Sequence, residues 1–294
     1  MNDNQALRVP SRCLEQRSRI MIWGDGKEAP RREFAVLQLK WIALSVTLLF
    51  LLMGTAWAGG LLGPPQSVSR EAGGLHTGIG YGYLEDIYKN GTQYLLRQNQ
   101  VYSDLGYGAR NWDFYGRIGA SDIKISDAFR STQSSTTTSK NDFKDQWGYF
   151  GTLGAKGFYP FNKSFGIGVF TQASYFFTDF SDQVAGDQNG VPFTTELKVN
   201  SFWDVNFGVG FQATFLRDIR VYAGPYLYYS QLKTSPSETV SGVDLLAENR
   251  TIHNRKIAGG FVGVDIPITR GFRLNVETEF SERFSFGTAI TYSY

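Results

Sequence analysis

From Leu75 onward, the chain alternates apolar or aromatic residues with small or polar ones. The clearest stretch is 203–215, where Trp, Val, Phe and Ala at odd positions face Asp, Asn, Gly, Gln and Thr at even positions. In a second stretch, 272–280, the positions between the apolar residues carry Arg, Asn and Glu. A period of two is typical of a β-strand with one apolar face. The charged and glycine-rich second face indicates a sheet whose other side is not an ordinary dry core.

The alternation predicts about ten strands, although eight or twelve remain possible. Many are ten or more residues long, and a tilted strand needs about 9 to 11 residues to cross a bilayer. Every second link is tight, near 111, 162–163, 217–218 and 269–271, whereas the links after the first, third, fifth and seventh strands are longer and polar. This asymmetry is typical of a closed antiparallel transmembrane β-barrel with short periplasmic turns. The predicted strands are 75–84, 93–110, 112–124, 146–158, 164–178, 196–215, 219–232, 252–266, 271–280 and 283–294.

The last predicted strand places its hydrophobic residues on one face. They are Phe284, Phe286, Ile290, Tyr292 and Tyr294. This strand resembles the C-terminal assembly signal of the bacterial outer-membrane β-barrel superfamily, although no motif matches a particular subfamily. The resemblance implies an integral outer-membrane protein that is surrounded by outer-membrane lipid. It also implies delivery by periplasmic chaperones to the barrel-assembly machinery.

The first 58 residues have the features of a cleavable export signal. Residues 41–53 are free of charge and follow Arg31, Arg32 and Lys40. Ala56 and Ala58 then take the small-residue positions that signal peptidase requires, so we expect cleavage after Ala58. An uncleaved inner-membrane anchor is the alternative, and either Met1 or Met21 could be the start. Residues 59–74 would then form a short periplasmic tail, and 75–294 the barrel.

Charge and cysteine content exclude several functions. The first 58 residues hold eight of the 29 basic and five of the 27 acidic residues, which leaves 21 and 22 and a net charge of −1 for the remainder. A chain without basic excess gives no indication of a nucleic-acid groove. The single cysteine, Cys13, lies in the predicted signal, so the exported part can form neither a disulfide nor a thiolate metal site. We expect a monomer without cofactor or metal.

Charged residues on the polar faces of the strands are expected to point into the lumen. A ten-stranded barrel is only slightly wider than the eight-stranded type, whose interior is nearly filled by side chains. Opposite charges there could pair and plug the lumen, which we favour, or line a thin water path. The expected lumen residues are Asp104, Arg110, Arg117, Lys156, Asp204, Arg220, Asp265, Arg273, Glu277 and Glu279.

Candidate chemistry is sparse. His253, with Asp244 and Glu248 upstream, is placed near the outer rim, where the ten-stranded omptin proteases use an Asp-His pair. No omptin motif surrounds these residues, and the His-x-Ser element of lipid A deacylases is lost because Arg255 stands at its third position. His76 is expected at the opposite end of the barrel, too far away to share a metal. We therefore assign no catalytic, cofactor-binding or metal residue.

Three functions follow from this pattern. The leading hypothesis is a non-enzymatic outer-membrane barrel, either a narrow porin-like channel or a structural or surface-binding barrel that acts through its loops. The alternative is an outer-membrane hydrolase, omptin-like or lipid-modifying, with a His/carboxylate site at the rim. A secreted soluble β-sandwich is the least favoured, because it does not account for the strand lengths or the alternating links.

Overall fold

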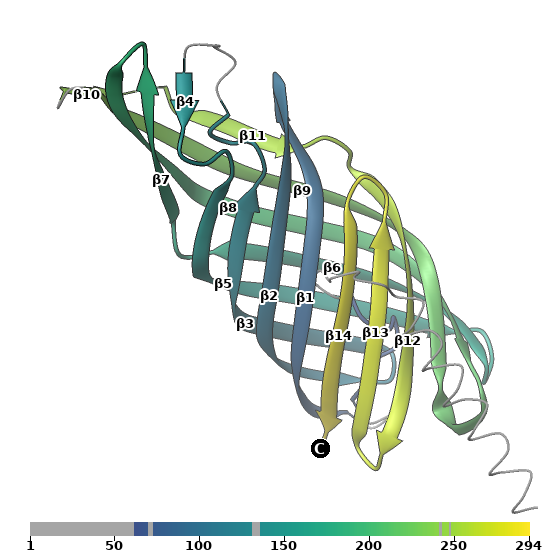
Figure 1. The fold of residues 1–294 in the computed structure, drawn as a ribbon. Helices are drawn as coiled ribbons and strands as arrows, with labels where there is room; N and C mark the ends of the chain where they lie inside the picture. The colour runs from purple at the N-terminus through teal and green to yellow at the C-terminus, as the bar shows by residue number, and fades with distance from the viewer. Residues whose placement is uncertain (1–61, 70–72, 131–135, 241–242, 247) are drawn as a thin grey trace, which may run out of the picture. The chain divides into compact units, whose positions relative to one another are not determined.

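The computed structural model describes residues 62–69, 73–130, 136–240, 243–246 and 248–294 (Figure 1). The predicted export signal, including Ala56 and Ala58, lies outside this part of the chain. Every described residue belongs to one compact unit, which we call the second unit of the chain. Within the described part, no helix is both long and apolar enough to span a membrane.

The second unit consists almost entirely of antiparallel strands. A single 3-10 turn, η1 (Leu216–Asp218), is the other regular element of the described residues. The strands are β1 (Gly74–Asn90), β2 (Thr92–Ala109), β3 (Trp112–Ile125), β4 (Thr136–Thr138), β5 (Phe143–Pro160), β6 (Phe165–Phe176), β7 (Phe180–Gln188), β8 (Val191–Thr214), β9 (Arg220–Val240), β10 (Val243–Leu246), β11 (Arg250–Asn254), β12 (Ala258–Thr269), β13 (Phe272–Phe280) and β14 (Phe284–Ser293).

Ten of these strands close into a ring. The ring runs β1-β2-β3-β5-β6-β8-β9-β12-β13-β14, and β14 pairs with both β13 and β1. At the β14/β1 seam, Phe286 lies opposite Tyr83 and Tyr292 opposite Thr77. The pairing of β8 with β9 completes the circle. A closed sheet leaves no unpaired strand edge within the ring, which is what a lipid environment demands of a spanning β-structure. The predicted fold class and the ten-strand ring are confirmed.

The two ends of the barrel differ in their connections. Short turns join the strands at one end, near Asn111, 161–164, η1 and 270–271, and we call this the periplasmic end. The other end, called the loop end, carries β4, β7, β10 and β11, which Figure 1 shows gathered opposite the C-terminus. The sequence predicted polar links for much of this region. The strands form there because cross-strand hydrogen bonds continue beyond the apolar part of the barrel.

Two further boundaries differ from the prediction. The first link was expected to be long, but β1 and β2 continue to a tight turn in which Asn90 opposes Thr92. Gly91 makes this turn possible, because its φ of 75° is readily adopted only by glycine. The predicted eighth strand is divided into β11 and β12, and β11 pairs with β1 and β9.

A band of large apolar side chains faces outward around the barrel. Ile79 is 64% exposed, Ile118 67% and Leu153 75%. Exposed apolar area on this scale is unfavourable in water and is suited to hydrocarbon. Aromatic residues border the band: Trp112, Tyr159 and Tyr294 toward the periplasmic end, and Trp147, Tyr149 and Tyr175 toward the loop end. The inside is therefore the polar side of this sheet over much of its length.

The loop-end half of the interior is an exception, because it holds an apolar core, which borders a cavity of about 190 Å³. Phe176 and Phe202 stack there with ring centroids 4.3 Å apart, and Phe176 also contacts Phe180. Val199 and Leu232 are fully buried in the same cluster. The polar and charged groups lie in the rest of the lumen, where they contact a segment of the chain that precedes β1.

Candidate functional site

Residues Leu62–Ser69, which we call the lumen segment, lie inside the barrel. Leu62 is completely buried, and Pro65 lies against β6 and β8. A Cβ added at Gly168 or Gly210 would come within 2.6 to 2.7 Å of the Pro65 ring, so these two glycines make the space that it fills. Residues 62–69 belong to the stretch 59–74, which we expected to be a short periplasmic tail, and in the structure they contact the inner wall of the barrel. The space left by Gly168 and Gly210 and the polar side chains of the barrel wall hold the lumen segment in place.

Glu277, on β13, binds the start of the lumen segment. Its carboxylate accepts the backbone N–H of Leu62 at 2.7 Å and that of Gly63 at 2.9 Å. It also accepts the Tyr222 hydroxyl at 2.7 Å, and Asn275 donates to that hydroxyl oxygen at 2.6 Å. A buried carboxylate needs such donors to offset its lost hydration. Glu277 therefore fixes a backbone segment instead of lining an open water path.

The rest of the lumen segment is bonded along its length. Gln212 and Gln66 bond reciprocally: the backbone N–H of Gln66 donates to the Gln212 side-chain oxygen at 3.2 Å, and Gln212 Nε2 donates to Gln66 Oε1 at 2.9 Å. Side chains of β5, β9 and β14 donate hydrogen bonds to backbone carbonyl groups of the lumen segment. These bonds join Lys156 to Pro64 at 3.3 Å, Arg220 to Ser67 at 3.0 Å and Ser293 to Val68 at 2.5 Å.

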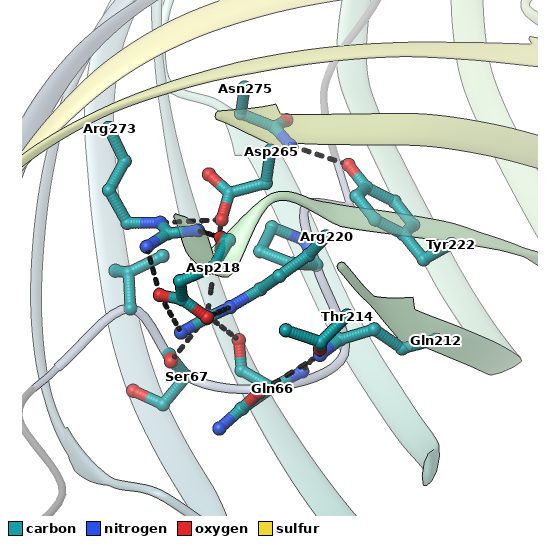
Figure 2. Close-up of polar contacts among 12 residues, drawn as sticks. Gln66, Ser67, Gln212, Thr214, Asp218, Arg220, Tyr222, Asp265, Arg273 and Asn275 are labelled. Atoms are coloured by element: carbon teal, nitrogen blue, oxygen red, sulfur yellow. Dashed lines mark hydrogen bonds and ion pairs between the residues drawn. The ribbon is translucent and has the colours of Figure 1, made fainter. Parts of the chain in front are cut away.

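Two arginines and two aspartates form an ionic cluster at the periplasmic end (Figure 2). Arg273 donates to Asp265 at 2.6 Å, to the Asp218 carboxylate at 2.6 Å and to the Asp218 backbone carbonyl at 2.7 Å. Arg220 lies 3.4 Å from Asp218 and 3.9 Å from Asp265. Asp265 is fully buried, and such a charge is tolerated only when it is paired. The cluster joins the turn at η1 to β9, β12 and β13.

His76 forms a second polar group with Asp104 and Arg117, which the sequence placed in the lumen, and with Ser69 and Asp113, which it did not single out. Ser69 Oγ lies 2.9 Å from His76 Nδ1, and Asp104 Oδ1 lies 3.4 Å from Nε2. Asp113 is 3.8 Å from Nδ1, and Arg117 donates to Asp104 at 3.1 Å. A serine, a histidine and a carboxylate in contact resemble a hydrolase triad. The void beside them measures about 40 Å³, and the hydrogen bond with His76 ties Ser69 to β1.

Arg283 forms a third group, in the middle of the lumen. It is 2% exposed and lies 3.2 Å from Asp86 and 2.8 Å from Asp204. Its guanidinium also lies over the Tyr228 ring at 3.9 Å, which is a cation–π contact. The void beside Arg283, which Glu279 also lines, measures about 30 Å³. Such a volume accommodates only a few water molecules.

The residues expected in the lumen are all placed within these groups or beside them. Arg110 lines a cavity at the periplasmic mouth. The others lie on the inner face of the barrel: Asp104, Arg117, Lys156, Asp204, Arg220, Asp265, Arg273, Glu277 and Glu279. The predicted assembly residues Phe284, Phe286, Ile290, Tyr292 and Tyr294 belong to the last strand and its end.

The described side chains at the rim show no contact between His253 and a carboxylate. His253, on β11, stacks on Tyr229 with ring centroids 6.3 Å apart. Among the described residues, no hydrogen bond or ion pair joins His253 to a carboxylate, and Glu248 is exposed. Asp244 lies on β10, and its side chain is outside the described part. No group of three potential metal ligands occurs among the described residues.

Comparison with known proteins gives structural similarities only. No family model matches the chain, and no curated protein matches it. The translocator domain of the autotransporter NalP from Neisseria meningitidis aligns at 10% identity over 74% of this chain and 88% of its own, with a TM-score of 0.40. The outer membrane protease OmpT from Escherichia coli aligns at 10% identity over 75% and 97%, with a TM-score of 0.41. The monoaromatic hydrocarbon channel CymD aligns at 10% identity over 75% and 88%, with a TM-score of 0.31.

These similarities carry no information about activity. The class of the protein rests on its own strand pairing and surface, namely a closed antiparallel ring with an outward apolar band bordered by aromatic residues. Those are the features of a transmembrane barrel of the outer-membrane type.

Proposed function

We propose that this protein is a non-enzymatic outer-membrane barrel that is closed to solutes and acts through the strands that extend from its loop end. The filled lumen is the observation that supports the first half of this proposal. The apolar core occupies one half, the ionic groups and the lumen segment occupy the other, and the internal voids between them measure about 30 and 40 Å³. Voids of this size are smaller than a hydrated ion, which supports a lumen that is closed to solutes.

The second half of the proposal rests on the length of β8 and β9. Their pairing continues to Phe193 and Val240, well beyond Trp203 and Tyr229 at the border of the apolar band. At about 3.3 Å per residue, the part of β8 from 191 to 200 alone adds roughly 30 Å of strand. β7 and β10 extend this sheet sideways. A paired, largely polar ribbon of this kind is a rigid platform for binding at the cell surface.

A gated channel is the second candidate. It is favoured by the way the lumen segment is held, through side-chain hydrogen bonds and without pairing to any strand of the ring. Such bonds can be exchanged with water, so the segment is separable from the wall in principle. The apolar half would still have to rearrange before solutes could pass, which is why we favour the closed barrel.

Planar-bilayer recording tests the proposal. The purified, refolded protein should give no conductance steps, and a variant with Phe176 and Phe202 both replaced by Ala should remain silent while the lumen segment stays bound. Heat-modifiable migration on gels would verify insertion of both proteins. Regular steps from the wild-type protein would contradict a closed barrel and favour the channel.

A further inference from the structure

A basic cavity lies at the periplasmic mouth, beneath the lumen segment. It has a volume of about 530 Å³, and we call it the periplasmic bowl. Its volume falls within the range of small-molecule sites. Its charged lining residues are Arg110, Lys163, Arg220, Arg270, Arg273 and Asp218.

Four of the five cations of the bowl fall into two groups. Arg220 and Arg273 are nearly buried and paired with Asp218 and Asp265, so they form a rigid basic floor (Figure 2). Lys163 and Arg270 lie in the periplasmic turns and are exposed. Within the described part of the chain, neither of them forms a hydrogen bond or an ion pair. Their charges are therefore available to a ligand without breaking an internal contact.

The electrostatic balance of the bowl favours anions. Five basic side chains line it, against Asp218 and the Asp265 carboxylate behind the floor. These two acids offset Arg220 and Arg273, so the exposed charges of Lys163 and Arg270 add a net positive charge to the bowl. A concave surface with low-dielectric walls concentrates such a field and attracts counter-charges. The planar guanidinium groups also match the geometry of phosphate and carboxylate oxygens.

We propose that the periplasmic bowl binds a multiply charged oxyanion, a phosphate or carboxylate compound presented from the periplasm. A singly charged anion would neutralise only one of the two exposed turn cations, Lys163 and Arg270, whereas a multiply charged anion can pair with both. The bowl is open toward the periplasm, and the lumen segment closes its inner side. It therefore admits a compact solute or the end of a flexible polymer. This site lies at the opposite end of the barrel from the proposed surface platform and does not depend on it.

Titration calorimetry of the full barrel in detergent, at low ionic strength, tests this site. The probes are tripolyphosphate and citrate, with acetate as the singly charged control. The test variant is Lys163→Gln/Arg270→Gln, which changes only exposed turn residues. The matched control is Lys89→Gln/Lys144→Gln, which removes the same charge from exposed positions at the loop end. Heat-modifiable migration establishes that both variants are folded.

We expect saturable binding of at least one polyanion and weaker or no binding of acetate. Losing two exposed charge contacts should weaken binding roughly fivefold or more in the bowl variant and leave the control variant unchanged. Preference for tripolyphosphate would identify a phosphate ligand, and preference for citrate a carboxylate ligand. Absence of saturable binding by either polyanion, or equal weakening in the two variants, would overturn the proposal.

Discussion

The two halves of the lumen are closed by different physical means. Toward the loop end, aromatic and aliphatic side chains of the wall meet across the barrel, as Phe176 and Phe202 do. Toward the periplasmic end, the wall presents carboxylates, amides and guanidinium groups to a segment of backbone. The apolar half belongs to the wall itself and cannot leave it. The polar half contains a segment that is held by hydrogen bonds, which can be exchanged with water, so we expect this half to open more readily than the apolar one.

The largest effect is expected from a cavity in the apolar half. Phe202→Ala removes a ring that is 3% exposed and stacked on Phe176, and such truncations destabilise a core by about 3 to 5 kcal/mol. Urea unfolding in lipid vesicles, followed by tryptophan fluorescence, measures this loss. The lumen segment should keep its protection from proteolysis. Early cleavage near Leu62 in this variant would show that the two halves are not independent.

A smaller effect, confined to the polar half, is expected from Glu277→Gln. The amide keeps one acceptor oxygen but loses the charge that strengthens the bonds from Leu62 and Gly63. Hydrogen bonds to charged groups contribute about 1.5 to 3 kcal/mol, so the lumen segment should detach more often. Hydrogen exchange at the Leu62 and Gly63 amides measures this opening.

Glu279→Gln is the matched control for that experiment, because Glu279 lies two residues away on the same face of β13. The structure gives it no hydrogen bond to the lumen segment. If both variants accelerated exchange equally, the anchoring role assigned to Glu277 would be wrong.

The smallest effect is expected at the loop end, outside both halves of the lumen. A hydrogen bond from Arg255, with further help from Lys256, lowers the pKa of Glu282 from its ordinary 4.5 to about 2. A carboxyl with a lowered pKa in the folded state contributes stability above the ordinary pKa and loses it as the pH falls toward the lowered one. Between pH 4.5 and pH 2, the melting temperature of the wild type should therefore fall further than that of the Glu282→Gln variant. Parallel curves for the two proteins would exclude this contribution.

Alternation along the chain was sufficient to predict the barrel, but it fails where the strands are irregular. β8 contains a bulge between Asn200 and Trp203, and Ser201 there has a φ of 49°. Val199 and Phe202 consequently both point inward although their positions differ in parity. A strict period of two cannot predict this, and so the apolar core of the loop-end half was missed.

The lumen segment was missed for a different reason. Its sequence, LGPPQSVS from residue 62, has no strand period and resembles a linker in composition. Its place depends on glycine notches at Gly168 and Gly210, which come together only when β6 and β8 pair. The sequence did not predict Arg283 as a lumen residue, because it lies beside a turn, where charged residues are commonly solvated. Its partners Asp86 and Asp204 lie far from it in sequence.

The anchors of the lumen segment also constrain the order of assembly. Ser293, which binds Val68, and Glu277, which binds Leu62 and Gly63, lie on the last two strands of the chain. The segment that they hold precedes the first strand, so it cannot be fixed until β13 and β14 have joined the sheet. The same β14 closes the ring against β1. Docking of the lumen segment is thus one of the last events of folding, and it marks a finished barrel.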